Sequence, residues 1–443
     1  MRHTSVFEFD YLTSDQEAAT ELQATCISCD AFNYLKEVSL STYETETRKC
    51  LSLCKRYGYE LIQVKNYVGV LFTPTGEHIE VLPKIGRKKS DPALAKKVAQ
   101  DTLLMMLQHL GIFRHLVTNQ ASVVTKKMPL LEVFISQFLA SVNLLVKRGL
   151  KSDYVRTVDN QNFLKGKLLV AEQLRHNLVN QHKFYVEFDE YQINRPANRL
   201  IKTAMVTLEK YTRLATNQKL LRELAFAFAD VPLSKSIKQD INDLKLDRSM
   251  KDYYAPIDWA KIILEGFSPL SMQGDHNALS LLFPMESVFE SYVASILREQ
   301  LAEEVTLTTQ ARSKYLVIHN EQNQFLLKPD LLVRLPNNKK MVMDSKWKLL
   351  DESLSNGGLS QSDFYQMFAY GHKYLDGKGD MVLIYPSCET FQNPIKTSFN
   401  FNENLRLWIV PMDLAPDIEN YERFKLPENL IQTTALLQIT ANS

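Results

Sequence analysis

The sequence predicts a multidomain protein of the α+β class. Its 443 residues exceed what one hydrophobic core usually accommodates, so two or three domains are expected. Apolar β-prone runs lie near both ends of the chain, and apolar positions spaced by three and four residues, typical of helices, dominate the middle. We therefore expect an N-terminal mixed α/β domain over residues 1–120, a mainly helical middle region over 121–280, and a C-terminal domain over 281–443 with a mixed sheet flanked by helices.

The N-terminal part predicts a short strand, two helices and then β structure. The helices are expected over Asp30–Lys36 and Tyr43–Tyr57, and Gly58 is expected to end the second one as its C-cap. Two β-prone runs follow, 61–72, which forms one strand or a bulged pair, and 78–85.

The middle part predicts helices interrupted by strands. A helix over 93–110 comes before this region. Within it, the expected helices cover 130–145, a segment after 169 that ends near Asn180, and 198–214, with one or two more over 216–246, and the expected strands cover 154–158, 163–169 and 184–191. Residues 247–280 contain Pro256, Pro269 and Gly274, which favour an irregular domain junction. Two basic segments are either solvated surface or contacts with phosphate, DNA or a partner subunit: the loop Gly86–Pro92 and the group Arg156, Lys165, Lys167 and Arg175.

The C-terminal part predicts the order helix, strands, helix, strands. Pro284 opens a helix that extends to Glu303, and a hairpin joins two apolar runs through the turn Pro336-Asn337-Asn338. The remaining expected elements are a strand over 314–318, the hairpin strands over 325–334 and 340–348, a helix over 362–374, and strands over 379–386 and 405–410.

Composition narrows the class of protein. The formal charge of +1 gives no global basic field, so any DNA contact must come from local patches. We find no apolar window long enough to span a membrane and no apolar core of a signal peptide at the start, so we expect a cytoplasmic protein without a membrane partner. The cysteines are spaced like two halves of a zinc site, but one pair falls in a helical pattern, so reduced structural thiols are favoured. They are Cys26, Cys29, Cys50, Cys54 and Cys388.

The predicted hairpin brings two acidic residues and a lysine together. Asp330 stands at the head of one run, and Asp344 and Lys346 lie near the end of the other. Side chains two apart on a strand share a face, so Asp344 and Lys346 point the same way and Ser345 points to the other face. Converging carboxylates repel unless a cation lies between them, and Mg²⁺ (or Mn²⁺) prefers such oxygen ligands. A lysine beside the ion can orient or deprotonate water, as phosphodiester hydrolysis requires.

Asp-x-Lys alone occurs by chance in many chains, so neighbouring residues matter. Glu290 lies just past the apolar stripe of the helix that precedes the hairpin and is a candidate ligand or water holder, although a boundary residue paired with lysine is equally consistent. Gln366 and Tyr370 are neighbours on one face of the helix that follows. The backbone carbonyl of Ser345 is a further candidate ligand.

The pattern Pro-Asp followed by Asp-x-Lys resembles the PD-(D/E)xK nuclease core. Taken with the rest of the chain, it resembles the McrC family, the nuclease subunits of McrBC-type modification-dependent restriction systems, and the related LlaJI-like subunits. The matching pieces are Val64–Val70, Ile79–Ile85, Phe163–Leu168, Phe188–Tyr191, Asn198–Lys202, Val288–Glu290, Lys328–Asp330, Asp344–Lys346 and Asp363–Gln366.

The resemblance implies partners and roles. The partner would be a McrB-like AAA+ GTPase hexamer that binds GTP itself, since no Gly-x-x-x-x-Gly-Lys-Ser/Thr motif occurs here. The N-terminal domain would insert into that ring and stimulate GTP hydrolysis, and the C-terminal domain would cut double-stranded, modified DNA, with a possible homodimer through the nuclease domain. Asp330, Asp344 and Lys346 match the family's catalytic positions.

Two other functions stay open. The chain could be a nuclease-inactive activator of a GTPase ring, which the intact acids and lysine disfavour. It could also be a stand-alone DNA-repair nuclease, which would cut plain DNA without nucleotide.

Overall fold

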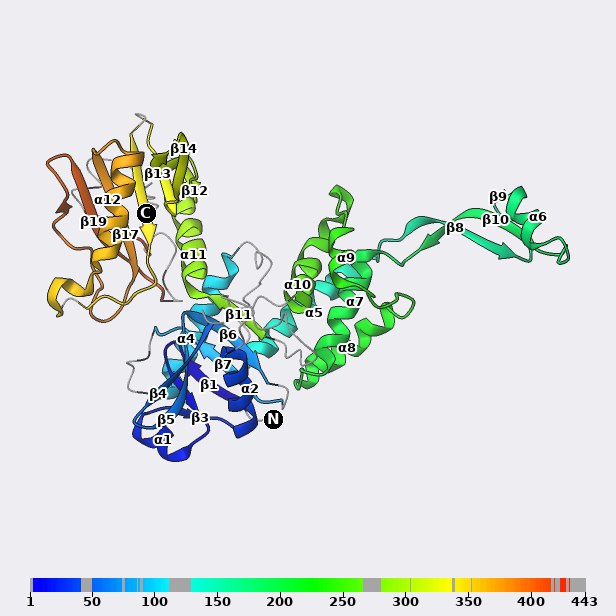
Figure 1. Ribbon diagram of the computed structural model, residues 1–443, viewed down its shortest axis with the longest axis horizontal. Coiled ribbons are helices and arrows are strands. Elements are labelled where there is room, and N and C mark those ends of the chain that lie inside the picture. Colours follow the sequence, from blue (N-terminus) through cyan, green and yellow to red (C-terminus); the bar gives the residue numbers. More distant parts are fainter. Residues whose placement is uncertain are drawn as a thin grey trace, which may run out of the picture. The chain divides into compact units, whose positions relative to one another are not determined.

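The computed structural model divides the chain into two compact units, coloured by sequence in Figure 1. The first unit combines residues 1–126 with 282–443, and the second contains residues 127–281. The structure describes residues 3–40, 50–73, 76–85, 87, 91–110, 129–265, 280–302, 304–336, 339–351, 353–415, 418, 423–427 and 430.

The N-terminal part of the first unit contains two four-stranded sheets, ordered β1-β7-β6-β11 and β3-β2-β5-β4. Its helix α4 is the one expected over 93–110, and Asp91 caps it by accepting a hydrogen bond from Ala93 N. The elements are β1 (His3–Phe7), β2 (Tyr11–Thr13), α1 (Gln16–Glu21), β3 (Thr25–Cys26), α2 (Cys29–Leu40), β4 (Leu51–Arg56), β5 (Tyr59–Val64), β6 (Tyr67–Phe72), β7 (His78–Leu82), α4 (Pro92–Gln108) and β11 (Ser280–Pro284).

The expectation of a helix over Tyr43–Tyr57 is wrong where the structure describes it. The strand β4 pairs with β5 in antiparallel register. The turn between them has positive φ at Tyr57 and Gly58, so this glycine serves a hairpin instead of a helix end. Of the two cysteines whose i,i+4 spacing suggested a helix, Cys54 lies in β4 and Cys50 precedes it, and residues 43–49 lie outside the described part. The run 61–72 forms two strands that belong to different sheets.

The second unit is helical with one long strand pair. The helices expected at 130–145 and 198–214 are present as α5 and α7, and β8 pairs with β10 in antiparallel register over nine residues. Its elements are α5 (Leu130–Arg148), β8 (Asp153–Gln161), β9 (Lys167–Leu168), α6 (Val170–His176), β10 (Phe184–Gln192), α7 (Pro196–Glu209), α8 (Ala215–Ala227), α9 (Ile237–Asn242), η3 (Arg248–Tyr253) and α10 (Tyr254–Glu265).

Two expectations for the second unit are wrong. Residues 248–265 are helical, because Pro256 lies in the first turn of α10, where its missing N–H is no loss. The remaining positions, 266–279, lie outside the described residues. Helix α5 is long and apolar enough to cross a membrane by length and composition, against our expectation of no such window. Its apolar side chains pack as a core against α8 and α10, and core helices pass the same test.

The C-terminal part of the first unit is a six-stranded mixed sheet ordered β12-β15-β16-β17-β19-β18. The pairs β12–β15 and β15–β16 are antiparallel, and β16–β17 and β17–β19 are parallel. The elements are α11 (Met285–Gln300), β12 (Thr306–Thr309), β13 (Lys314–His319), β14 (Gln322–Leu327), β15 (Leu331–Arg334), β16 (Lys340–Ser345), η5 (Ser355–Gly358), α12 (Gln361–Tyr374), β17 (Gly379–Pro386), β18 (Phe399–Asn400) and β19 (Leu405–Met412).

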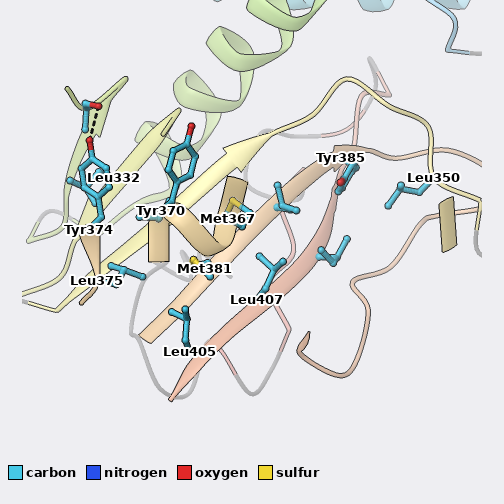
Figure 2. Packing of buried hydrophobic residues seen from close by; sticks show 14 of the residues in the cluster. Leu332, Leu350, Met367, Tyr370, Tyr374, Leu375, Met381, Tyr385, Leu405 and Leu407 are labelled. Atoms are coloured by element: carbon cyan, nitrogen blue, oxygen red, sulfur yellow. Dashed lines mark hydrogen bonds between the residues drawn. The ribbon is translucent and has the colours of Figure 1, made fainter. Parts of the chain in front are cut away.

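The central strand β16 contacts both α11 and α12. Its Val342 belongs to the core formed with Met367 and Tyr370 of α12 (Figure 2). Side chains alternate along a strand, so Met341 and Met343 face away from that core. The sheet thus has the expected mixed pairing and flanking helices.

The run expected as one strand over 325–334 is interrupted. Its first half belongs to β14, which pairs with β13 in a separate two-stranded sheet, and its second half is β15. Lys328, Pro329 and Asp330 lie between the two strands. Proline cannot donate to a strand ladder, so the break at Pro329 is where it is tolerated. The break leaves Asp330 outside the strand, immediately before Leu331.

Candidate active site

The β15–β16 hairpin brings Asp330 to the end of β16. Leu331 pairs with Met343, so the next step along the ladder sets Asp330 opposite Asp344. The Asp330 carboxylate occupies the place where β15 would otherwise continue. Its Oδ2 accepts hydrogen bonds from the Ser345 backbone N and from Ser345 Oγ, both at 2.8 Å. Asp330 is thereby fixed to the strand that contains Asp344.

Asp344 is buried with one of its oxygens unmatched. It is 1% exposed, and its Oδ1 has no hydrogen-bond partner among the described residues. Oδ2 lies in an ion pair with Lys346 Nζ, so these two side chains share a face, as alternation predicts. Burial raises the pKa of Asp344, the Asp330 charge raises it further, and Lys346 opposes both effects. Such a carboxylate gains most from a nearby cation.

Ser345 differs from the expectation. Its hydroxyl was expected to point away from the acids, yet it donates to Asp330. The difference arises because Asp330 lies beyond the end of β15 and can reach the neighbouring residue. Lys346 keeps its charge: burial lowers its pKa, but Asp344, and then Asp330 and Asp363, raise it above the ordinary value. The site therefore contains one ammonium beside two acids.

Glu290 of α11 belongs to the same cluster. It is half-buried, and its Oε1 accepts a 2.7 Å hydrogen bond from Gln310 Nε2. Burial raises the pKa of Glu290, and the charge of Asp330 raises it further. Glu286, one turn earlier, is exposed and accepts from Asn66 Nδ2 at 3.2 Å. The charge of Glu290 thus interacts with that of Asp330.

Gln366 and Tyr370 of α12 act on the segment that precedes Asp330. Gln366 Nε2 donates to Tyr370 Oη at 2.8 Å, and Tyr370 Oη donates to the Lys328 carbonyl at 3.0 Å. The neighbouring Tyr374 donates to the Leu327 carbonyl at 2.9 Å. These two tyrosines hold the chain at the break between β14 and β15, so they fix where Asp330 begins.

The sequence did not predict the contact between Lys348 and Asp363. Lys348 Nζ donates to both oxygens of Asp363, at 2.9 and 2.8 Å, and Tyr385 Oη donates to Asp363 Oδ2 at 3.1 Å. Asp363 lies in a matched piece of the sequence, but nothing in the pattern connects it with Lys348. A lysine two residues after Lys346 on an extended segment is the one signal that could have suggested the pair.

The donor set fits a hard divalent cation with few protein ligands. Within the described residues, no group of three or more His, Cys, Asp or Glu side chains could hold a metal ion. Two acids are brought together, and Asp344 Oδ1 has no hydrogen-bond partner in the part of the chain that the structure describes. Mg²⁺ is usually bound by one or two carboxylates and several waters, so this sparse set suits it. All five cysteines are free thiols.

Comparisons with known proteins show which family and which solved structures this chain is similar to. A family model described as McrBC 5-methylcytosine restriction system component matches residues 62–386. The structure is similar to a solved chain from the refined half-complex of a tetradecameric assembly of Thermococcus gammatolerans McrB AAA+ hexamers with bound McrC, with a TM-score of 0.66, 20% identity, and coverage of 95% of this chain and 98% of that chain. A chain from the cryo-EM structure of the Thermococcus gammatolerans McrBC complex matches with a TM-score of 0.48, 21% identity and coverage of 68% and 88%. A search of curated proteins finds no match.

Proposed function

Because the chain belongs to the McrC family of McrBC 5-methylcytosine restriction system components, we propose that it is a metal-dependent endonuclease subunit that acts with a GTP-hydrolysing AAA+ ring. The proposed substrate is double-stranded DNA that carries a modified base, and the proposed location is the cytoplasm. The observation that supports nuclease activity most strongly is the buried Asp344 beside Asp330, since its Oδ2 is ion-paired with Lys346 and its Oδ1 has no hydrogen-bond partner among the described residues.

The C-terminal sheet supports assignment to the PD-(D/E)xK nucleases. The first acid directly follows Pro329, and the second acid and the lysine lie at the end of β16, where the chain passes from the antiparallel to the parallel part of the sheet. The proposed catalytic groups therefore lie near the carboxyl end of the central strand β16. Substrate would approach this end of the strand.

Each residue of the candidate site has a separate proposed role in hydrolysis. Asp330, Asp344 and the Ser345 carbonyl would hold Mg²⁺ or Mn²⁺, which when bound lowers the pKa of a water and offsets negative charge on the phosphate. The Lys346 ammonium orients the attacking water and stabilises the charge that develops on the phosphate oxygens. Glu290 holds a further water through its half-buried carboxylate. Tyr370 holds the chain before Asp330 by donating to the Lys328 carbonyl, and Gln366 orients the Tyr370 hydroxyl.

The surface that contacts the ring is proposed at two places. The N-terminal residues 1–120 are the first, as the family resemblance implies. The second is the strand pair β8–β10 with β9 and α6, which extends as a ribbon away from the helices of its own unit (Figure 1). It exposes an unusual number of large apolar side chains, which mark interaction sites: Val158, Phe163, Leu164, Val170, Leu174, Leu178 and Val179. Of the predicted basic cluster, Lys167 lies on β9, Arg175 lies on α6, and Lys165 lies between β8 and β9.

A pair of substitutions separates the two surfaces. Gly166 has φ of +73°, and a Cβ there would lie 2.4 Å from the Glu187 carbonyl, so Gly166→Ala distorts the ribbon. Gly149 also has positive φ, but a Cβ there meets nothing within 4 Å, so Gly149→Ala is the matched control for backbone strain. Loss of GTPase stimulation in the first variant alone assigns the contact to the ribbon, and equal stimulation in both leaves it to residues 1–120.

The nuclease assignment is tested with the purified full chain and the McrB-type GTPase encoded by the same genome. Modified plasmid DNA is expected to be cut with GTP and Mg²⁺, and neither Asp344→Asn nor Lys346→Met should cut it while both still stimulate GTP hydrolysis. Arg334→Met, an exposed charge on the same sheet, is the control and should cut normally. Stimulation without any cutting by the wild type would identify an activator subunit, and nucleotide-independent cutting of plain DNA would identify a repair nuclease.

A further inference from the structure

A buried acid of the N-terminal sheets binds the chain immediately beyond the candidate site. Glu8 follows β1 and is 0% exposed. Its carboxylate accepts two hydrogen bonds from the indole of Trp347, with Nε1 at 3.2 Å from Oε1 and 3.0 Å from Oε2. Glu8 Oε2 also accepts from the Lys84 backbone N at 3.0 Å. Glu8 and Trp347 are 339 positions apart, so this contact joins the two sequence segments of the first unit.

Lys84 adds a second bond to the same residue. It lies just past β7, and its Nζ donates to the Trp347 backbone carbonyl at 2.9 Å. The ammonium also lies 5.6 Å from the centre of the Trp347 ring and 5.1 Å from that of Phe9, within the range of cation–π attraction. The side chain and the main chain of one tryptophan are therefore both held from the N-terminal sheets.

Trp347 connects Glu8 and Lys84 with the candidate site. It follows Lys346 directly in sequence, so fixing its carbonyl and ring limits where the Lys346 main chain can lie. Its ring also packs against Phe289, with centroids 5.3 Å apart, and Phe289 precedes Glu290. The residue after Lys346 and the residue before Glu290, Trp347 and Phe289, are thus in contact. Glu8 and Lys84 fix the first of these two rings.

We propose that Glu8 and Lys84 are positioning residues of the nuclease site, which set the Asp344–Lys346 segment and Glu290 through Trp347 and so make cleavage depend on the state of the N-terminal sheets. This inference rests on the proposed nuclease function. A merely structural contact would be met by apolar packing, which avoids the cost of burying charge. Here Glu8 and Lys84 both bind Trp347, the residue next to the proposed catalytic lysine.

The first experiment measures the geometry without using activity. Hydrogen exchange is followed by mass spectrometry on a peptide over residues 341–349 of the full-length chain. Glu8→Ala and Lys84→Met should speed exchange of its protected amides at least tenfold, because the Trp347 anchor is lost. Glu8→Gln keeps an acceptor for the indole N–H and should stay within threefold of wild type. Lys55→Met removes an exposed charge from β4 and is the control for the loss of a lysine.

The second experiment measures turnover with the partner ring, at a temperature well below unfolding of every variant. Glu8→Ala and Lys84→Met should lower kcat for DNA cleavage at least tenfold and leave KM for DNA and GTPase stimulation within twofold, and Glu8→Gln should restore most of kcat. The proposal is overturned if exchange in 341–349 is unchanged in both variants, or if exchange quickens equally across the whole first unit. It is also overturned if kcat stays within twofold while exchange is fast. A wild type that cuts no DNA refutes the nuclease assignment, and in that case the exchange measurement still decides whether Glu8 and Lys84 hold this segment.

Discussion

Glu8 makes the stability of the first unit depend on pH in a direction that surface acids do not produce. Burial raises the pKa of Glu8 from 4.5 to about 7, Lys84 and the Trp347 hydrogen bond oppose this rise, and the charge of Glu286 adds to it. The folded state therefore binds this proton more tightly than the unfolded state. The resulting stabilisation is complete below pH 4.5 and is lost as the pH rises through about 7.

The magnitude follows from the same values. A difference of one pKa unit between the folded and unfolded states corresponds to about 1.36 kcal/mol of folding free energy. The rise of the Glu8 pKa from 4.5 to about 7 therefore corresponds to about 3 kcal/mol. The groups that face Glu8 are Lys84 and Trp347, and the charge of Glu286 acts on it as well. Glu8→Gln removes the titration but keeps an acceptor, so the variant should gain about 3 kcal/mol relative to wild type between pH 4.5 and 8.

The assay is urea unfolding at six pH values, followed through amide exchange of β1 and β7 so that the unit containing Glu8 is measured. Glu37→Gln, an exposed acid on α2, is the control and should show no comparable gain. If the difference between Glu8→Gln and wild type is constant within 1 kcal/mol from pH 4.5 to 8, Glu8 does not titrate as a buried acid and the reasoning fails.

Three further predictions concern other residues. Saturating Mg²⁺, at about 100 times its Kd, should stabilise the wild type by about 2.7 kcal/mol and leave Asp344→Asn unchanged in a thermal scan, whereas equal shifts would place the ion elsewhere. Tyr370→Phe loses the bonds to Gln366 and to the Lys328 carbonyl, so urea unfolding should show a loss of about 1–2 kcal/mol and cleavage should slow, and wild-type values in both assays would contradict this. Glu132→Ala leaves Thr212, Asn217 and two backbone N–H groups without their acceptor, which should cost about 3 kcal/mol in circular-dichroism melts of the helical unit, and Glu132→Gln, which keeps one acceptor, should cost less.

Local patterns account for what could be predicted from the sequence. Alternation along a strand sets Asp344 and Lys346 on one face, and the turn at Pro336 sets the hairpin that brings Asp330 opposite. Both rules act over a few residues and need no knowledge of the fold. The same locality explains the errors. Cys50 and Cys54 are four apart, a spacing that favours a helix, but Cys54 lies in a strand that only its pairing with β5 reveals.

Contacts between distant segments could not be predicted. Nothing near Glu8 indicates that its partner is Trp347, because both residues are ordinary members of apolar segments. The Lys348–Asp363 pair is a second case, since a lysine after a strand and an acid in the first turn of a helix each have a simpler local explanation. Such pairs follow from the packing of whole elements, which a single sequence does not specify.

Two buried acids of the first unit show how a positioning carboxylate differs from a candidate ligand. Glu8 is fully buried, and three N–H···O contacts from Trp347 and the Lys84 backbone satisfy its oxygens. Asp344 is equally buried, yet its Oδ1 has no hydrogen-bond partner among the described residues, and its neighbours are a second acid and the lysine that is ion-paired with Oδ2. A carboxylate that only positions the chain is stabilised by donors, as Glu8 is. The unmatched Oδ1 of Asp344 beside a second acid is the reason that we propose a bound cation at this carboxylate.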